Sequence, residues 1–184
     1  MQFHFDINKT LAATTFLLKK EGGKSDIFPL LKMIYWADRD ALIHWGKPIT
    51  GDSAVSMDKG PVPSTIYNLM NGREFSYKEE WGRYITQRDV NSISVRSEFD
   101  VDYLSEREKE ALGRAWQLVN SMPRWKIADW LHSNCPEWQD PHGSSIPIDY
   151  KIILRASGKT DAEIEQIEKD NDAAAYAQFL ISES

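Results

Sequence analysis

The chain has 184 residues, of which 41% are hydrophobic and 27% charged, and its formal net charge is -6. This length suits one domain of ordinary size, and the composition is typical of a globular protein and excludes disordered and collagen-like chains. Clustered Lys and Arg are needed to hold nucleic-acid phosphates, so an acidic chain without a basic run disfavours direct nucleic-acid binding.

The first residues and the cysteine content indicate a cellular location. The start MQFHFDINKT has neither the basic nor the apolar region of a secretory signal peptide, and the lone Cys135 has no partner for an internal disulfide. No apolar run approaches the roughly 18 residues that a membrane span requires. We therefore expect a cytoplasmic protein without a membrane partner.

Two helices are predicted at the start of the chain. Asp6 is placed to cap a helix that runs to about Lys20 and stops at the sequence EGG. Asp26 is placed to cap a second helix, in which apolar residues recur at helical spacing from Ile27 to Trp45. Because apolar residues cover so much of its circumference, we expect the second helix to be the central, most enclosed one.

A rigid joint is predicted between a strand and the following helix. The alternating stretch SAVSM, residues 53–57, predicts a short strand. Proline fixes its own φ and biases the preceding residue toward extended conformations, so residues 60–63, Gly-Pro-Val-Pro, predict a stiff, non-helical connector. A short helix should then begin near Ser64 and stop at Asn71-Gly72.

A β-hairpin and a capped helix are predicted next. The strands of the hairpin are expected at residues 81–88 and 92–97, because the second of these segments alternates apolar and polar residues. Ser105 and Glu108 form the S-x-x-E capping pattern, which predicts a helix that Pro123 ends.

The last part of the chain is predicted to be helical around one long loop. Residues 125–132 predict a short helix, and three prolines and a glycine mark a loop over residues 134–147. The capping pattern recurs before a final acidic helix. The fold class is therefore α+β: a predominantly helical single domain with a small antiparallel sheet or hairpin. We expect that domain to occupy residues 1–158 and the acidic helix to occupy residues 159–184.

His132, Cys135, Asp140 and His142 form the most enzyme-like cluster, since imidazole, thiolate and carboxylate all bind transition metals. A structural zinc site normally has four ligands in paired spacings, whereas H-x2-C-x6-H supplies only three of the usual type. A cysteine nucleophile needs an adjacent base, and a buried structural cysteine is the commoner case. We expect no catalytic residue, metal or cofactor, and a metal or thiol hydrolase centred on Cys135 is the alternative.

Two tryptophans near residue 130 are candidates for a contact surface. Trp125 and Trp130 are five positions apart, about 140° of net rotation on a helix, so they cannot both be central on one face. We expect one of them to be exposed. An exposed Trp is a common anchor at protein interfaces, and packing at the edge of the core is the other interpretation.

The run LLKMIYWADRDALIHWGKPITGDSAVSMDKGPVPSTIYNLM, residues 30–70, resembles the Panacea domain, the module of SocA-like antitoxins and of phage-associated GepA-like proteins. The matching elements are LLKMIYWADR on a helix, GKPITGD as a turn, a short strand, and KGPVPSTIY leading into the next helix. The resemblance covers at least residues 7–70 and, more loosely, the chain to about residue 155. The matching positions expected to be structural are Tyr35, Asp38, Gly51, Gly60 and Pro61.

The resemblance implies a non-enzymatic antitoxin that neutralises a protein toxin, encoded by an adjacent gene, through direct contact. It also implies a link to phage defence. In SocA-like members the bound toxin is handed to a cytoplasmic ATP-dependent protease, so a protease adaptor is an alternative function. The resemblance implies no catalytic residues, because none are established for the family.

Six positions are the candidate toxin contacts: Asp52, Lys59, Val62, Tyr67, Trp125 and Trp130. We expect Val62 and Tyr67 to pack inward, and Asp52 and Lys59 to lie near the turn surfaces. A structural corner within a binding scaffold is the other interpretation of the joint. A second hypothesis concerns the segment 159–184, which has seven acidic residues against two lysines and would complement a basic toxin.

Overall fold

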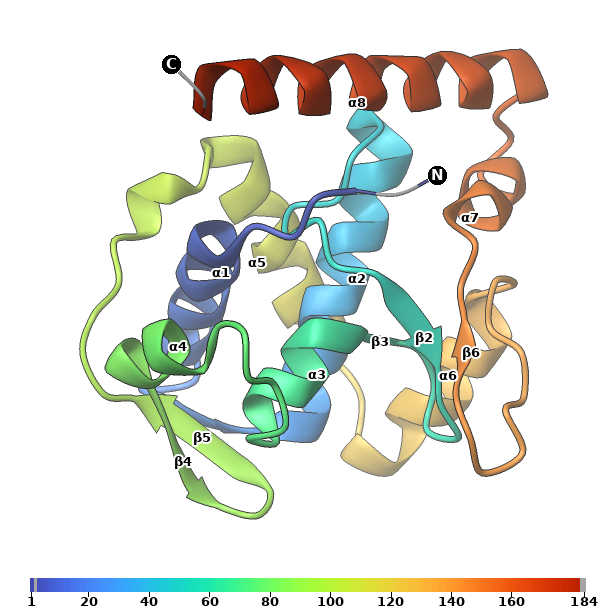
Figure 1. Ribbon diagram of the computed structural model, residues 1–184. Coiled ribbons are helices and arrows are strands. Elements are labelled where there is room, and N and C mark those ends of the chain that lie inside the picture. The colour runs from blue at the N-terminus through green and yellow to red at the C-terminus, as the bar shows by residue number, and fades with distance from the viewer. Residues whose placement is uncertain (2, 183–184) are drawn as a thin grey trace.

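The computed structural model describes residue 1 and residues 3–182, and over this part of the chain it is predominantly helical (Figure 1). The α-helices are α1 (Ile7–Lys20), α2 (Ile27–Trp45), α3 (Ser64–Met70), α4 (Lys78–Tyr84), α5 (Glu106–Asn120), α6 (Ile127–Asn134), α7 (Tyr150–Ala156) and α8 (Asp161–Ser182). Two 3-10 helices, η1 (Val101–Tyr103) and η2 (Arg124–Lys126), precede α5 and α6. Together with the short antiparallel sheets, these helices confirm the predicted α+β class.

The strands form two separate antiparallel sheets. One sheet has the order β1-β5-β4, built from β1 (Lys24–Asp26), β4 (Ile85–Asp89) and β5 (Ser92–Val95). The other has the order β3-β2-β6, built from β2 (Ala54–Ser56), β3 (Val62–Pro63) and β6 (Ile146–Pro147). In the second sheet Val55 pairs with Val62, so the predicted joint turns back and its last two residues become a strand.

Helix α2 is the centre of the core, as its apolar pattern predicts. It packs against α1, α5, α7 and β3, and Figure 1 shows it running through the middle of the molecule. Its side chains at Leu30, Ile34, Ala37 and Ala41 are completely buried. The helix ends at Gly46, which has a φ of 79° and so closes it in the left-handed conformation that glycine adopts without strain.

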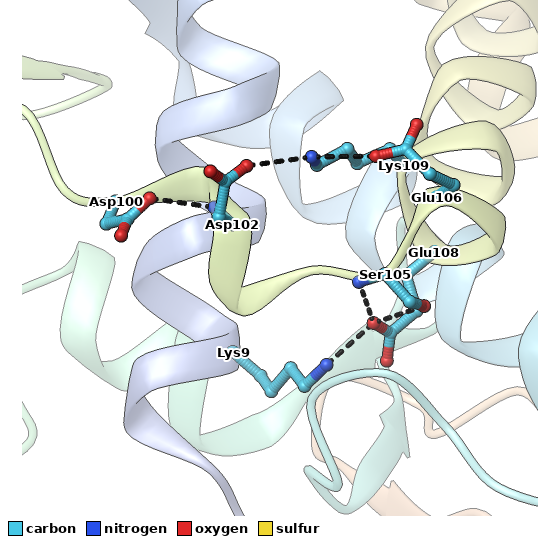
Figure 2. Close-up of polar contacts among 7 residues, drawn as sticks. All are labelled: Lys9, Asp100, Asp102, Ser105, Glu106, Glu108 and Lys109. Carbon is cyan, nitrogen blue, oxygen red and sulfur yellow. Dashed lines mark hydrogen bonds and ion pairs between the residues drawn. The ribbon is translucent and has the colours of Figure 1, made fainter.

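Helix α5 begins with the capping box that its sequence predicts (Figure 2). The backbone N–H and the hydroxyl of Ser105 donate to Oε2 of Glu108 over 2.7 and 2.8 Å. The ammonium group of Lys9, on α1, donates to the same oxygen over 2.6 Å. The cap therefore also links α1 to α5, two helices that both pack against α2.

The first predicted hairpin strand is partly wrong, because residues 81–84 belong to helix α4. Trp81 is 6% exposed and faces the core from that helix, and β4 begins only at Ile85. Trp81, Tyr84 and Ile85 have the i, i+3, i+4 spacing of a helix face, so this stretch fits both a helix and a strand.

Helix α8 lies across the end of the molecule where α2 ends (Figure 1). The hydroxyl and backbone N–H of Thr160 donate to Glu163, which confirms the predicted capping box. Ile164 is 3% exposed, and Asn171 donates to the backbone oxygen of Gly46 over 3.0 Å. Of the predicted acidic segment, Glu183 lies outside the described residues. None of the described helices combines the length and the apolar character that crossing a membrane would require.

Candidate functional site

A buried lysine on the central helix forms hydrogen bonds with the backbone of the Gly60-Pro61 joint. Lys32 lies on α2 and is 1% exposed. Its ammonium group donates to the backbone oxygens of Gly60 and Pro61, both over 2.9 Å, and lies 5.4 Å from the centre of the Phe28 ring. Three groups that favour a positive charge therefore surround this nitrogen. The contact fixes the joint on the central helix.

Burial also changes the acidity of this lysine. Removal from water disfavours the charged form, so the pKa of Lys32 falls from 10.5 to about 7, although the charge of an ionised Cys135 acts in the opposite direction. Gly60 has a φ of 90°, and a Cβ placed there would lie 3.4 Å from the side chain of Leu131 and 3.5 Å from Nζ of Lys32. These are ordinary contact distances, so it is the left-handed φ, and not lack of space, that favours glycine at this position of the joint.

Lys32 is one of the residues that line a cleft of about 370 Å³. Segments far apart in the sequence line it: the start of α2, the joint, α3, the β4–β5 turn, η2 and the loop before β6. Its lining includes Phe28, Lys59, Val62, Tyr67, Val90 and Arg124. This volume lies within the range of ordinary binding pockets, and apolar walls with a few polar groups are typical of such sites.

The GKPITGD turn, residues 46–52, is an internal brace. Asp38 on α2 is buried, and its carboxylate accepts from the Thr50 backbone N–H over 2.9 Å and from the Thr50 hydroxyl. Burial raises the pKa of Asp38 to about 7. Gly51 has a φ of 68°, and a Cβ there would lie 1.9 Å from the backbone oxygen of His4. The turn therefore depends on glycine at this position.

Asp52 caps helix α3 from inside the protein. Its two carboxylate oxygens accept from the backbone N–H groups of Thr65 and Ile66 over 3.1 and 2.9 Å. The hydroxyl of Tyr150 donates to its backbone oxygen. Burial raises the pKa of Asp52, although these N–H donors act in the opposite direction. The side chain is 1% exposed, so the expectation that Asp52 lies near a turn surface is wrong.

A second polar cluster connects α2 to the segment after α6. Glu137 is 2% exposed and accepts from the Tyr35 hydroxyl over 2.5 Å and from Nε of Arg39 over 2.7 Å. Burial, followed by the charge of Glu137, raises the pKa of Tyr35 well above 10. Tyr35 and Arg39 lie on the same face of α2 as Lys32, at i+3 and i+7. One face of α2 thus fixes both the joint and Glu137.

The residues of the predicted metal or thiol cluster differ in burial and in the side chains that they contact. Cys135 is 1% exposed, and burial raises the pKa of its thiol to about 12, which opposes the thiolate form that a nucleophile needs. His132 stacks on Trp138 with ring centres 3.7 Å apart, while His142 is exposed beside Asp140. Within residues 1 and 3–182, no three or more His, Cys, Asp or Glu side chains converge in a way that could hold a metal ion.

The two candidate tryptophans lie in different environments, as their spacing predicts. Trp125 is 76% exposed and lies on η2 directly after Arg124, a residue of the cleft. Trp130 is half-buried on α6 and meets Trp36 edge to face, with ring centres 4.9 Å apart. Packing at the edge of the core therefore describes Trp130, and Trp125 remains available to a partner.

Three of the six candidate toxin contacts are brought together by the fold. Lys59, Val62 and Tyr67 line the same cleft. Val62 is buried, as expected, whereas Tyr67 is half-buried and Lys59 is exposed. Sequence reasoning did not identify Lys32 or Glu137, because their partners are 28 and 102 residues away and neither residue belongs to a recognisable short motif.

The comparison with protein families identifies the class of protein to which this architecture belongs. The family model described as antitoxin SocA-like, Panacea domain, matches residues 30–139, which is more than half of the 184 residues. The chain therefore belongs to the SocA-like Panacea antitoxin family. The matched region contains Lys32, the joint and Glu137, and so includes both polar clusters of α2. Comparisons with curated proteins and with solved structures find no match.

Proposed function

We propose that this protein is the antitoxin of a toxin–antitoxin pair and neutralises its cognate toxin in the cytoplasm by direct, non-enzymatic protein binding. Membership of the SocA-like Panacea family is the observation that carries this proposal. The toxin is expected to be the product of an adjacent gene.

The arrangement of the joint supports binding by a rigid surface. Lys32 fixes the backbone of Gly60 and Pro61, and Asp52 fixes the start of α3. A partner that binds elements already ordered in this way loses less conformational entropy on association. The buried thiol of Cys135, with its raised pKa, makes thiol hydrolysis a poor alternative.

The test is growth rescue by co-expression. Reading frames beside the gene for this chain are expressed singly, and the one that arrests growth is expressed again with this chain. We expect growth to be restored and the two purified proteins to elute as one complex. If growth is restored in a host with its ATP-dependent proteases, but no complex of the two proteins can be purified, neutralisation by stable binding is contradicted.

Two further arms of this experiment separate the alternatives. Repeating the rescue in hosts that lack individual ATP-dependent proteases distinguishes simple occlusion, which persists, from delivery of the toxin to a protease, which is lost in one host. The variant Cys135→Ala is expected to rescue growth as well as the wild type does, because the buried thiol has no part in binding. Loss of rescue by a folded Cys135→Ala protein would favour thiol chemistry instead.

A further inference from the structure

The cleft above Lys32 combines aromatic walls with an exposed apolar rim. Phe28 and Tyr67 contribute rings to its lining, and Val90, at the β4–β5 turn, lines it while 79% exposed. Trp125 is 76% exposed and directly follows the lining residue Arg124 in the chain. Large apolar side chains exposed beside a cleft are the usual anchors of protein interfaces.

The charges of the cleft differ in sign from those of the whole chain. The chain has a formal net charge of -6, whereas the lining contains Lys59 and Arg124 against Asp58 alone, besides Lys32, whose lowered pKa leaves it only partly charged near pH 7. Arg124 is already paired with Asp26, and an oxygen of Asp58 accepts from the backbone N–H of Gly143 over 2.9 Å.

Lys59 is the exposed cation of this cleft that the fold leaves without a carboxylate partner in the described part of the chain. It is exposed, and no carboxylate among the described residues forms an ion pair with it. Lys32, by contrast, is fully engaged by the backbone oxygens of the joint. A ligand that enters the cleft therefore meets one unpaired ammonium group at the joint, apolar side chains such as Phe28 and Val90, and a few polar groups such as Asn91.

We propose that this cleft is the docking site for a segment of the cognate toxin that carries a large apolar side chain next to a carboxylate. The apolar side chain packs among Phe28, Tyr67 and Val90, and the carboxylate pairs with Lys59. The inference rests on the proposed antitoxin function and names the chemistry of the surface that binds. A positive site on an acidic protein favours an acidic segment through both approach and contact.

The acidic helix α8 offers a weaker case for the same role, because much of its charge is used within the chain. Glu168 pairs with Lys151, Glu165 with Lys169 and Asp161 with Arg155. None of the residues that line the cleft belongs to α8. The two surfaces can therefore be tested independently.

The test compares variants in the cleft with matched variants outside it. Lys59→Glu and Val90→Ser change the cleft. Outside it, Lys169→Glu makes the same charge reversal at a lysine whose side chain is 65% exposed and whose pair with Glu165 is exposed and weak, and Phe75→Ser replaces an apolar side chain that is 80% exposed. All four side chains are exposed, so the melting temperature should be unchanged. We expect each cleft variant to weaken toxin binding at least tenfold in Kd and to impair rescue, and the two controls to match the wild type.

A suppressor screen identifies the partner group. Toxin mutants that Lys59→Glu antitoxin can again neutralise, and that still arrest growth when expressed alone, should carry a substitution of an Asp or Glu. Wild-type rescue combined with full rescue by both cleft variants would overturn this inference while leaving the proposed function intact. Failure of the wild type to rescue would overturn both. A homodimer of the isolated chain that Lys59→Glu dissociates would show that a second copy occupies the cleft, and would also overturn it.

Discussion

A lysine buried under a proline joint has both a structural use and an energetic cost. Lys32 satisfies two backbone oxygens that would otherwise be buried without a donor near the cleft. Its lowered pKa means that the charged form is less stable in the folded protein than in the unfolded chain. The joint is therefore held by an interaction whose strength depends on pH.

We predict that the destabilisation caused by burying the charge of Lys32 decreases as the pH rises above 7, so that the free energy of unfolding increases. The pKa is about 7 when folded and 10.5 in the reference state, so between these values the unfolded chain binds more protons, and stability rises with pH. In Lys32→Met this rise is absent. The free energy of unfolding of the wild type relative to Lys32→Met should increase by about 2 kcal/mol from pH 7 to pH 9, measured by urea unfolding.

The comparison with the variant removes the contribution of other titrating groups. Asp38 has a pKa raised to about 7, so its contribution to stability is lost as the pH rises from its reference value of 3.8 toward 7. Cys135 has a pKa of about 12 and keeps its proton over the measured range. If the difference between wild type and variant does not change with pH, Lys32 is not desolvated as described. An NMR titration of the lysine Cε signals provides an independent check.

At the scale of elements, helices were predicted better than strands. The helices that begin after Asp6 and Ser105 have caps within a few consecutive residues, so their signals are local. The predicted cap at Asp26 is wrong, because its side chain makes no capping hydrogen bond and pairs with Arg124, but the apolar residues of α2 are equally local. Strands β1 and β6 have three and two residues and exist through pairing with β5 and β2. Nothing in such short stretches specifies a distant partner strand.

The candidate site was likewise predicted only where its residues are close together in the sequence. The Gly-Pro-Val-Pro joint was predicted from the sequence because proline restricts the backbone locally, and its neighbours Lys59 and Tyr67 were identified through the resemblance to the Panacea domain. The walls contributed by Phe28, Val90 and Arg124 were not, since only the folded chain brings residues of α2, the hairpin turn and η2 together.

Two glycines with the same φ provide a test of how far the turn at residues 46–52 depends on close contact with the His4 backbone. Gly51 and Gly72 both have a φ of 68°, but a Cβ at Gly51 would lie 1.9 Å from the His4 oxygen, whereas the nearest atom at Gly72 is 3.8 Å away. We predict that Gly72→Ala lowers the free energy of unfolding by about 1 kcal/mol, the usual cost of the left-handed region. Gly51→Ala should cost clearly more, because the backbone at His4 must also move.

Urea unfolding of both variants measures this difference directly. The substitution and the φ penalty are the same in each, so the difference between the two variants reports the steric clash alone. Equal destabilisation would mean that the segment around His4 moves at little cost. The turn would then not be a rigid part of the protein.

At the scale of the whole molecule, α2 connects the surfaces that function requires to be fixed. Lys32 holds the joint, Asp38 holds the turn at Thr50, and Tyr35 and Arg39 hold Glu137. Three segments distant in sequence are thus positioned by polar contacts with one buried helix. We therefore expect the shape of the cleft, and toxin binding to it, to be unaffected by the removal of an element that does not pack along the buried part of α2.

Helix α8 is the element whose removal tests that independence. Among the described residues of α8, Ile164 is buried and Ile167 is partly buried against the core, and full burial of one such side chain contributes about 1.5–3 kcal/mol. The ion pairs of Asp161 and Glu165 are exposed and add little, while Glu168 forms partly buried pairs with Lys151 and the N-terminal ammonium group. We predict that a chain of residues 1–158 folds, is less stable than the full chain by about 3 kcal/mol, and binds the toxin with unchanged Kd, since no residue of the cleft lies beyond Ser144.

A full-length Ile164→Ala variant separates the stability of α8 from its charge. It should lose part of the same stability while keeping every acidic residue, so the pair of proteins distinguishes loss of packing from loss of charge in urea unfolding and toxin-binding measurements. Weak binding by a folded 1–158 chain, with normal binding by Ile164→Ala, would show that the acidic segment complements a basic toxin. Because α8 lies across the end of α2 and outside the cleft, we expect both proteins to bind as the wild type does.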